Sequence, residues 1–280
     1  MEHLEKIKDI LIHIAIEDGE IIEDRFNSRG TFLDVRIKDN DMHNIVTDAD
    51  ENSQKFLIEN ITEKVLGIGI KKEQIGFICE ENGVSNIGEY TFVIDPIDGT
   101  TAFYAGFPAF AISIALFLNN ELVLGLIYNP MTKQMYYAIK NKGAYCYTKK
   151  GENIKINSKD LPLNKMIFMG SLSKVFNIEL IQIEMYKELH KHCLGFAGTL
   201  SFVDSVIKLL DDTNFVGITI LGGGMLWDIS ACELIVTELG GSVCDYEGKK
   251  NILDLKNPDK KYPSIVYTKS TIDDILNIIK

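Results

Sequence analysis

The sequence predicts a mixed α/β fold, and three patterns along its 280 residues carry that prediction. Near the N-terminus, apolar residues recur at helical spacing. The middle of the chain holds short runs rich in β-branched and aromatic residues, separated by turn residues. In the C-terminal part, candidate strands and candidate helices alternate. This length and order of elements fit one large globular unit or two fused subdomains.

The chain opens with a predicted amphipathic helix from Leu4 to about Asn27. Its apolar residues follow one another at three, four and seven positions, at Leu4, Ile7, Leu11, Ile14 and Ile21. A short two-stranded ribbon is expected over residues 31–37 and 45–46. A second helix follows, capped by Asp48 or Asp50 and ended by a pair of glycines.

The middle of the chain predicts a largely antiparallel meander. Its candidate strands are 75–79, 91–94, 109–118, 122–128 and 134–139. Two connections, at Asn119–Asn120 and Asn129–Thr132, are typical of tight hairpin turns. The polar stretch 149–160 then predicts a boundary between two subdomains. Residues 1–150 would form an N-terminal subdomain with most of the site's acids, and residues 151–280 a C-terminal subdomain that completes the site.

Strands and helices alternate beyond this boundary. The candidate strands are 166–170, 214–220 and 264–267, and the candidate helices are 178–189, 199–210, 228–239 and 271–279. Such alternation is typical of a sheet covered by helices. We therefore expect a second α/β layer on top of the meander.

Composition and charge narrow the functional classes. The chain holds 29 Lys and Arg against 40 Asp and Glu, which gives a formal net charge of −11 at pH 7. Such a surface repels nucleic acid and anionic lipid, so we expect neither as a partner. The most apolar stretch, 105–118, is shorter than the roughly 20 residues that cross a bilayer. Five scattered cysteines and the lack of a signal-peptide pattern favour a cytoplasmic protein.

The most informative segment is FVIDPIDGTT at residues 92–101, where an apolar strand leads into two carboxylates three residues apart. Pro96 stiffens the link, so Asp95 and Asp98 can both point at one cation. The following Gly99, Thr100 and Thr101 offer backbone N–H groups and hydroxyls to an anion. A surface turn that uses Asp, Pro and Gly for their dihedral preferences is the alternative interpretation.

Other acids can likewise be interpreted either as ordinary structural residues or as parts of a metal site. Glu80 follows the strand 75–79, and two strands that end together would bring it beside Asp95. Asp228 stands before an apolar helix and is either its N-cap or a further ligand for a hard cation such as Mg²⁺. Asp50 is either a helix cap or an acid that positions water. Together these carboxylates exceed what helix capping requires, which favours a metal site.

Four segments resemble the signature segments of the inositol monophosphatase family. They are VTDAD at 46–50, EEN at 80–82, DPIDGTTAF at 95–103 and WDISACELIVTELGG at 227–241. Their order and spacing extend over nearly the whole chain. The resemblance implies a layered αβαβα sandwich and Mg²⁺-dependent hydrolysis of a phosphomonoester.

The resemblance also implies a role for each acid. Glu80, Asp95 and the Ile97 carbonyl would hold a first Mg²⁺, and Asp95, Asp98 and Asp228 a second. Asp95 would then bridge the two ions. Paired metal ions of this kind clamp the attacking and leaving oxygens and lower the pKa of a bound water.

The catalytic residues implied by the resemblance are Asp50, Glu80 and Thr100. Thr100, hydrogen-bonded to Asp50, would orient the attacking water, and Glu80 would accept its proton. Backbone N–H groups near Gly99 and Thr101 would hold the phosphate. The substrate contacts implied in this way are Asp98, Gly99, Thr100, Thr101, Gly198, Thr199 and Asp228.

Departures from the family pattern fall in the segments that contact the substrate. Ala102 replaces the usual Asn, and Gly195 and Leu200 flank the retained Gly198-Thr199 pair where Arg and Ala are frequent. The stretch 221–226 lacks the acid with which inositol-specific members bind ring hydroxyls. We expect a small sugar or polyol phosphate as substrate, with inositol 1-phosphate first. The alternatives are fructose 1,6-bisphosphate, NADP and 3′-phosphoadenosine 5′-phosphate.

Three further expectations accompany this assignment. A non-catalytic binding module on the same fold is the competing functional class, and it would normally have lost one or more of the acids. The family resemblance implies a homodimer, and the apolar segment 107–128 could supply its interface. It also implies inhibition by Li⁺.

Overall fold

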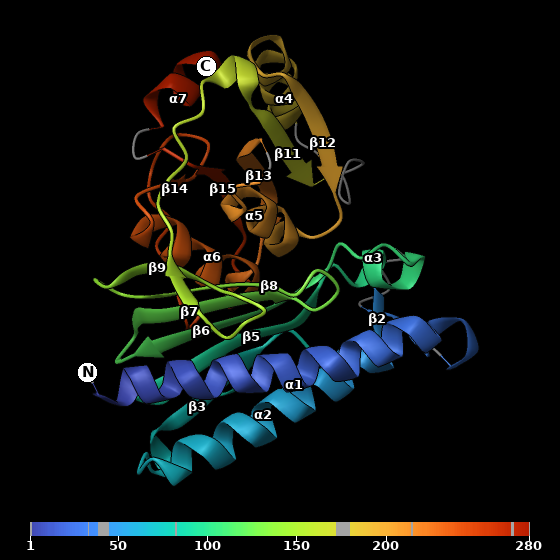
Figure 1. The fold of residues 1–280 in the computed structure, drawn as a ribbon, viewed down its shortest axis with the longest axis vertical. Helices are drawn as coiled ribbons and strands as arrows, with labels where there is room; N and C mark the ends of the chain where they lie inside the picture. The colour runs from blue at the N-terminus through green and yellow to red at the C-terminus, as the bar shows by residue number, and fades with distance from the viewer. Residues whose placement is uncertain are drawn as a thin grey trace.

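Five alternating layers of helices and strands make up the fold (Figure 1). A computed structural model describes residues 2–32, 34–38, 45–81, 83–171, 180–213, 215–269 and 272–279. Its helices are α1 (Glu2–Phe32), α2 (Asp48–Gly67), α3 (Thr100–Ala105), α4 (Leu180–His192), α5 (Phe202–Leu210), α6 (Leu226–Glu238) and α7 (Asp273–Ile279). Helices α1 and α2 form one outer layer, α5 and α6 lie between two sheets, and α4 and α7 form the other outer layer. The expected αβαβα sandwich is confirmed.

The larger sheet is the predicted meander. Its strands are β3 (Ile75–Cys79), β4 (Gly83–Asn86), β5 (Tyr90–Asp98), β6 (Ala111–Leu118), β7 (Glu121–Asn129), β8 (Gln134–Ile139), β9 (Gly143–Tyr147) and β10 (Asn153–Lys155). They lie in the order β10-β9-β8-β7-β6-β5-β3-β4. Only the pair β3 and β5, next to the edge strand β4, is parallel. Asn119 and Asn120 turn the β6–β7 hairpin with φ angles of 51° and 65°, as tight hairpin turns require.

The smaller sheet has five strands in the order β12-β11-β13-β15-β14. They are β11 (Ile167–Ser171), β12 (Gly195–Thr199), β13 (Val216–Gly224), β14 (Ser242–Cys244) and β15 (Tyr262–Tyr267). Strand β11 runs parallel to both its neighbours, and β15 runs antiparallel to both of its own. A separate ribbon pairs β1 (Val35–Ile37) with β2 (Ile45–Thr47).

Three apolar cores lie between the layers. Residues of α1, α2 and one face of the larger sheet form the first core. The opposite face of that sheet, α5, α6 and the smaller sheet form the second. The smaller sheet with α4 and α7 forms the third. Because the second core joins both sheets, the inner helices hold the two halves of the chain together.

Three features of the N-terminal part differ from the predictions. Helix α1 extends through residues 31–32, which were expected to begin the ribbon. Helix α2 is capped by Thr47 rather than by an aspartate. Asp50 instead occupies the third helical position and accepts a hydrogen bond from the Thr47 backbone N–H at 2.8 Å, which completes a capping box. A Thr followed by an acid three residues later gives this motif.

Two elements of the C-terminal part also differ. Residues 195–199 form strand β12, whereas the sequence placed Thr199 at a helix start. Helix α5 begins at Phe202 and is capped by the Ser201 side chain. Helix α6 begins two residues before Asp228, with Met225 at the N-cap position. The predicted helix starts at residues 178 and 271 lie outside the described residues.

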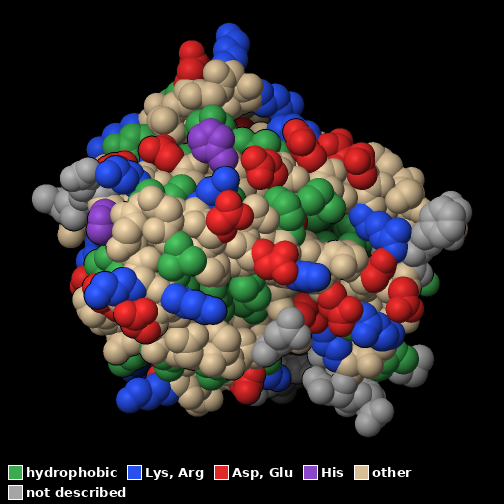
Figure 2. Space-filling view, turned by 90° about the horizontal axis from the view of Figure 1, so that it is seen from below, with side chains coloured by type: hydrophobic (Ala, Val, Ile, Leu, Met, Phe, Trp, Pro, Cys, Tyr) green, Lys and Arg blue, Asp and Glu red, His purple; other side chains and the backbone are tan. Residues whose placement is uncertain are grey.

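The predicted boundary stretch is not a simple linker, because β10 lies within it and pairs with β9. The division near residue 150 therefore stays a prediction. Figure 2, which views the molecule from the side of α1 and α2, shows acidic and basic side chains interspersed over that face. Within the described residues, no helix is both long enough and apolar enough to span a membrane.

Candidate active site

Strand β5 carries two of the predicted acids. Nearly all of its residues are buried, and Asp95 is only 1% exposed. The pairing with β6 is irregular between Asp95 and Asp98, so these two acids do not follow the simple alternation of a regular strand. The Ile97 N–H donates to the Asp95 carboxylate at 3.0 Å. Both acids lie within the strand, not beyond its end as the sequence suggested.

The third acid arrives on α6. Asp228 is at the third helical position and accepts a hydrogen bond from the Met225 N–H at 2.6 Å. The start of this helix is fixed from the sheet side, because the Ser113 hydroxyl donates to the Trp227 carbonyl at 2.9 Å. Asp228 therefore helps to cap the helix without being its N-cap residue, and it still reaches β5.

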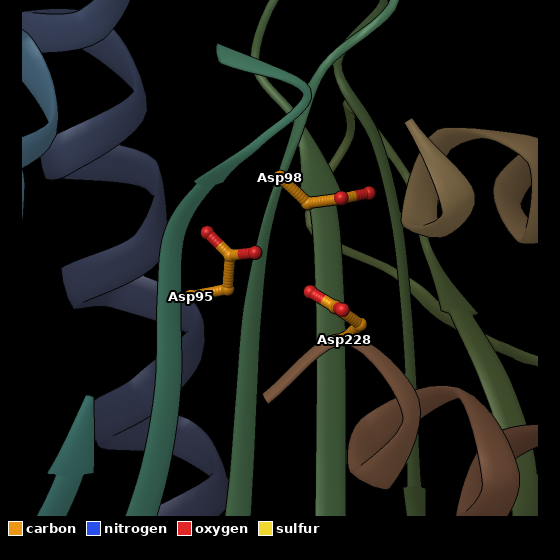
Figure 3. Close-up of side chains that lie close together, drawn as sticks. All are labelled: Asp95, Asp98 and Asp228. Carbon is orange, nitrogen blue, oxygen red and sulfur yellow. The ribbon is translucent and has the colours of Figure 1, made fainter. Parts of the chain in front are cut away.

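The side chains of Asp95, Asp98 and Asp228 lie close together (Figure 3). One oxygen from each lies within 4.8 Å of the other two. Burial raises the pKa of Asp95 well above its usual value, and the charges of Glu80, Asp98 and Asp228 raise it further. Burial and the charge of Asp228 likewise raise the pKa of Asp98. Three closely spaced carboxylates, of which Asp95 is fully buried, repel one another, and a bound cation would relieve that repulsion.

Glu80 lies at the expected strand end and next to Asp95, because its charge and a side-chain hydrogen bond between the two carboxyl groups both raise the pKa of Asp95. It also contacts Lys38. Strands β3 and β5 run in parallel, and the Glu80 N–H donates to the Ile94 carbonyl at 3.2 Å. The Glu80 carboxylate lies 3.1 Å from the ammonium of Lys38, which also donates to Glu81 at 2.7 Å. Glu80 is not in the group of three mutually close acids. Its neighbour Asn82, part of the EEN segment, lies outside the described residues.

Sequence reasoning missed Lys38. Burial alone would lower the pKa of its ammonium group, but the adjacent carboxylates of Glu80 and Glu81 outweigh burial and raise it. Burial raises the pKa of Glu81 to about 7, and the charge of Glu80 contributes. Lys38 precedes VTDAD by only a few residues, yet nothing in its local sequence indicates a partner 42 residues away.

Asp50 and Thr100 form the hydrogen bond that the resemblance implied. The Thr100 hydroxyl lies 3.0 Å from an Asp50 oxygen and 3.3 Å from the Ile97 carbonyl. Both Thr47 groups, the N–H and the hydroxyl, donate to the other Asp50 oxygen. Burial raises the pKa of Asp50 to about 6. The carboxylate is held rigidly and directs the Thr100 hydroxyl.

Asp98 has a second set of partners that the sequence did not reveal. Its Oδ2 accepts hydrogen bonds from the Ser201 hydroxyl at 2.5 Å and from the Val203 N–H at 2.6 Å. The first turn of α5 therefore orients Asp98. The one local signal for this contact is a serine directly before an amphipathic helix, which predicts that Ser201 caps α5.

The remaining predicted residues surround these acids. Gly99 has a left-handed φ of +99°, and a Cβ there would come within 2.8 Å of the Ser201 Cβ, so only glycine fits. Gly99 precedes α3, which begins at Thr100 and includes Thr101. Gly198 and Thr199 end strand β12, and the Thr199 hydroxyl accepts from the Ser201 N–H at 3.1 Å. Through Ser201 they lie near Asp98.

This donor set suits a hard divalent cation. The three clustered ligands all offer carboxylate oxygen, which Mg²⁺ prefers over nitrogen or sulfur. Cys232, whose thiol pKa is raised by burial and by the charges of Asp98 and Asp228, is fully buried nearby. Its protonated thiol is a poor ligand, so a soft metal ion is not favoured.

Comparisons with known proteins agree with this geometry. The model of the family described as "Inositol monophosphatase family" matches residues 3–271. An inositol monophosphatase of Dictyostelium discoideum is 29% identical over 273 residues, which cover 93% of this chain and 94% of that protein. A fructose-1,6-bisphosphatase/inositol-1-monophosphatase of Methanocaldococcus jannaschii is 28% identical over 242 residues, with 84% and 88% covered.

A solved structure extends the agreement to the whole fold. The crystal structure of an IMPase/NADP phosphatase complexed with Mg²⁺ and phosphate matches with a TM-score of 0.77. The match covers 98% of this chain and 95% of that one at 20% sequence identity. At this identity the likeness shows that the two chains share a fold.

Proposed function

This chain belongs to the inositol monophosphatase family, and from that premise we propose that it is a metal-dependent phosphatase of small sugar or polyol phosphates. Inositol 1-phosphate is the first substrate to test. The observation that carries the proposal is the meeting of Asp95, Asp98 and Asp228 within 4.8 Å, although β5 and α6 are far apart in the sequence. Three capping or surface acids would have no reason to converge in this way.

Mg²⁺ is the proposed cofactor. Asp95, Asp98 and Asp228 would hold one ion, and Glu80, Asp95 and the Ile97 carbonyl a second. When bound, such ions neutralise charge on the phosphate and acidify a water molecule. The Glu80 carboxylate contacts the ammonium of Lys38 through one oxygen, Oε1, at 3.1 Å, so a bound ion and Lys38 would share this carboxylate.

Thr100 would orient the attacking water. Its hydroxyl proton is directed at Asp50 and the Ile97 carbonyl, so its oxygen can only accept a hydrogen bond from a water molecule. The water is thereby held with a lone pair free to attack phosphorus. Glu80 would accept the proton that the water loses. In this scheme Asp50 is a positioning residue, because it acts through Thr100.

The phosphate would lie beside the turn at residues 98–101. Backbone N–H groups near Gly99 and Thr101 would donate to its oxygens, since amides in the first turn of a helix have no partner within the helix. Gly198 and Thr199 would contact the rest of the substrate from the β12 side. The stretch before Asp228 lacks an acid that would bind the ring hydroxyls of inositol, so the substrate would not be restricted to inositol phosphates.

A phosphate-release panel tests the proposal. The panel contains inositol 1-phosphate, fructose 1,6-bisphosphate, NADP and 3′-phosphoadenosine 5′-phosphate, each with Mg²⁺, with EDTA, and with Mg²⁺ plus Li⁺. We expect phosphate release that needs Mg²⁺, and we expect Li⁺ to inhibit it. The variant Asp95→Asn should lose activity by orders of magnitude while remaining folded. Absence of release from every substrate would favour a non-catalytic binding module.

We further propose that the protein is a homodimer. The expected apolar surface from 107 to 128 is mostly buried inside the chain, but Phe107 is 56% exposed and Tyr104 on α3 is also exposed. Two exposed aromatic side chains beside the site favour an interface there. Sedimentation equilibrium would test this proposal, and a monomer at micromolar concentration would contradict it.

A further inference from the structure

A cavity lies at the end of β5 opposite Asp98. It has a volume of about 460 Å³, and its walls come from α6, the β6–β7 hairpin and the loop after β14. Leu118 at this hairpin pairs with Tyr90, at the opposite end of β5 from Asp98. Eight residues of strand separate the two ends, which corresponds to roughly 25 Å. The hairpin end of the cavity is therefore far from Asp98, whereas Glu233 follows Asp228 by five residues on α6.

One wall residue, Glu233, has an unusual environment. It is 4% exposed, and its Oε2 has no hydrogen-bond partner among the residues that the structure describes. Its other oxygen lies 3.5 Å from the ammonium of Lys250, whose side chain is 73% exposed. Burial raises the pKa of this carboxyl group, and Lys250 only partly offsets that effect. A buried oxygen without a partner is costly, and a ligand that donates to it would remove that cost.

The other charged groups of the wall already have partners. Glu238 accepts hydrogen bonds from the backbone N–H groups of Asn141 and Gly143 at 2.7 and 2.9 Å. Glu121 forms an ion pair with Lys140. The glutamates outnumber the lysines in this wall, so an anion would be repelled. Among the charged groups of the wall, Glu233 is thus the one with a buried oxygen, Oε2, that lacks a partner within the described residues.

The rest of the wall combines apolar side chains with the polar residues Asn120, Thr237 and Asn251. Phe117, Leu122, Leu234 and Leu253 contribute side chains to it. A volume of this size is in the range of small-molecule sites, which combine apolar walls with a few polar anchors. A ligand that complements it carries a positive hydrogen-bond donor on a short hydrocarbon body.

We propose that this cavity binds a small aliphatic ammonium compound, with Glu233 as the anchor of its ammonium group. The ammonium donates to Oε2 and the hydrocarbon chain packs against the leucines. Lys250 competes for the same carboxylate from the solvent side. The proposal does not depend on the phosphatase activity.

Titration of n-butylammonium, followed by backbone amide chemical shifts, tests the proposal. Saturating Mg²⁺ is present throughout, so that the ammonium does not bind the acids of the active site. We expect saturable shifts at Leu122 and Leu234 and much weaker binding of n-butanol and of butyrate. Shifts confined to the first turn of α6, or equal binding of butyrate, would overturn the proposal.

Two variants separate the anchor from general effects. Glu233→Gln keeps the shape of the side chain but loses its charge, and it should weaken n-butylammonium binding about ten-fold. Lys250→Met removes the competing ammonium at an exposed position and should tighten binding. Glu247→Gln, which alters an exposed ion pair with Lys249, is the matched control and should change nothing. Unchanged binding in Glu233→Gln, or weaker binding in Lys250→Met, contradicts the proposal.

Discussion

At the scale of single residues, the hydroxyl of Thr100 connects a rigid carboxylate to the proposed water. Thr100→Val keeps the shape of the side chain but removes the hydrogen bond to Asp50. We expect kcat to fall by about 10²–10⁴-fold, the usual range for one group that assists proton transfer. Steady-state kinetics would measure the loss. Thr100→Ser restores the hydroxyl and should recover most of the activity, and failure of that rescue would contradict the role.

The buried carboxyl group of Asp18 should make the stability of the fold depend on pH. This α1 residue is fully buried and accepts a hydrogen bond from Ser53 of α2 at 2.6 Å. Burial raises its pKa from 3.8 to about 8, although the Ser53 hydrogen bond acts in the opposite direction. The folded chain therefore keeps a proton that the unfolded chain has lost. The stability that this proton supplies is complete below about pH 4 and is lost as the pH rises to about 8.

Asp18→Asn should remove this dependence. Between pH 4.5 and 7.5, the variant should gain about 1.4 kcal/mol in free energy of unfolding relative to wild type for each pH unit. Urea denaturation at several pH values measures the difference. Ser28→Ala, on the exposed surface of the same helix, is a control that should show no trend. A difference between Asp18→Asn and wild type that stays constant with pH would refute the assignment.

The sequence predicted the acids of the site far better than their partners. Asp95, Asp98 and Asp228 stand in motifs that are readable locally, and the first two follow an apolar strand. Ser201 donates to Asp98 from 103 residues away, and no local pattern encodes that pairing. Lys38 was missed for the same reason, because its partners Glu80 and Glu81 lie in the turn after β3, far away in the sequence.

At the scale of elements, the position of α6 depends on a close contact with β7. A Cβ on Gly125 would lie 2.7 Å from the Ala231 carbonyl oxygen, so the helix can approach only because this residue is glycine. Gly125→Ala should lower the free energy of unfolding by about 1–3 kcal/mol, as overpacking usually does. It should also weaken Mg²⁺ binding, because α6 carries Asp228.

Urea denaturation and Mg²⁺ titration measure these two effects. Gly67→Ala is the matched control, since a Cβ at the end of α2 would meet nothing within 4 Å. That substitution should leave both quantities nearly unchanged. A Gly125→Ala variant as stable as wild type would show that α6 has room to move.

The longer elements were predictable, and several short ones were not. The two long N-terminal helices and the meander have repeated apolar spacing that fixes their type. Strand β12 has the sequence GFAGT, in which two glycines weaken any strand signal. It forms because β11 supplies a parallel partner. Strands β9, β10 and β14 also went unpredicted, since each is short and stabilised by its neighbours.

At the scale of the whole molecule, the order of layers follows from which elements are apolar on all sides. Helix α6 is buried along nearly its entire length, as a helix between two sheets must be. Helix α1 has an exposed face and lies on the outside. The family resemblance gave the five layers at once. Apolar spacing alone gave the elements and the alternation, but not the stacking of one sheet over the other.

The convergence of acids from β5 and α6 is the central claim. Isothermal titration of Mg²⁺ in the presence of inorganic phosphate tests it most directly, with wild type and Asp228→Asn compared after circular dichroism has shown both to be folded. We predict saturable binding to wild type and binding at least ten-fold weaker in the variant. Equal Mg²⁺ affinity in the two proteins would contradict the claim.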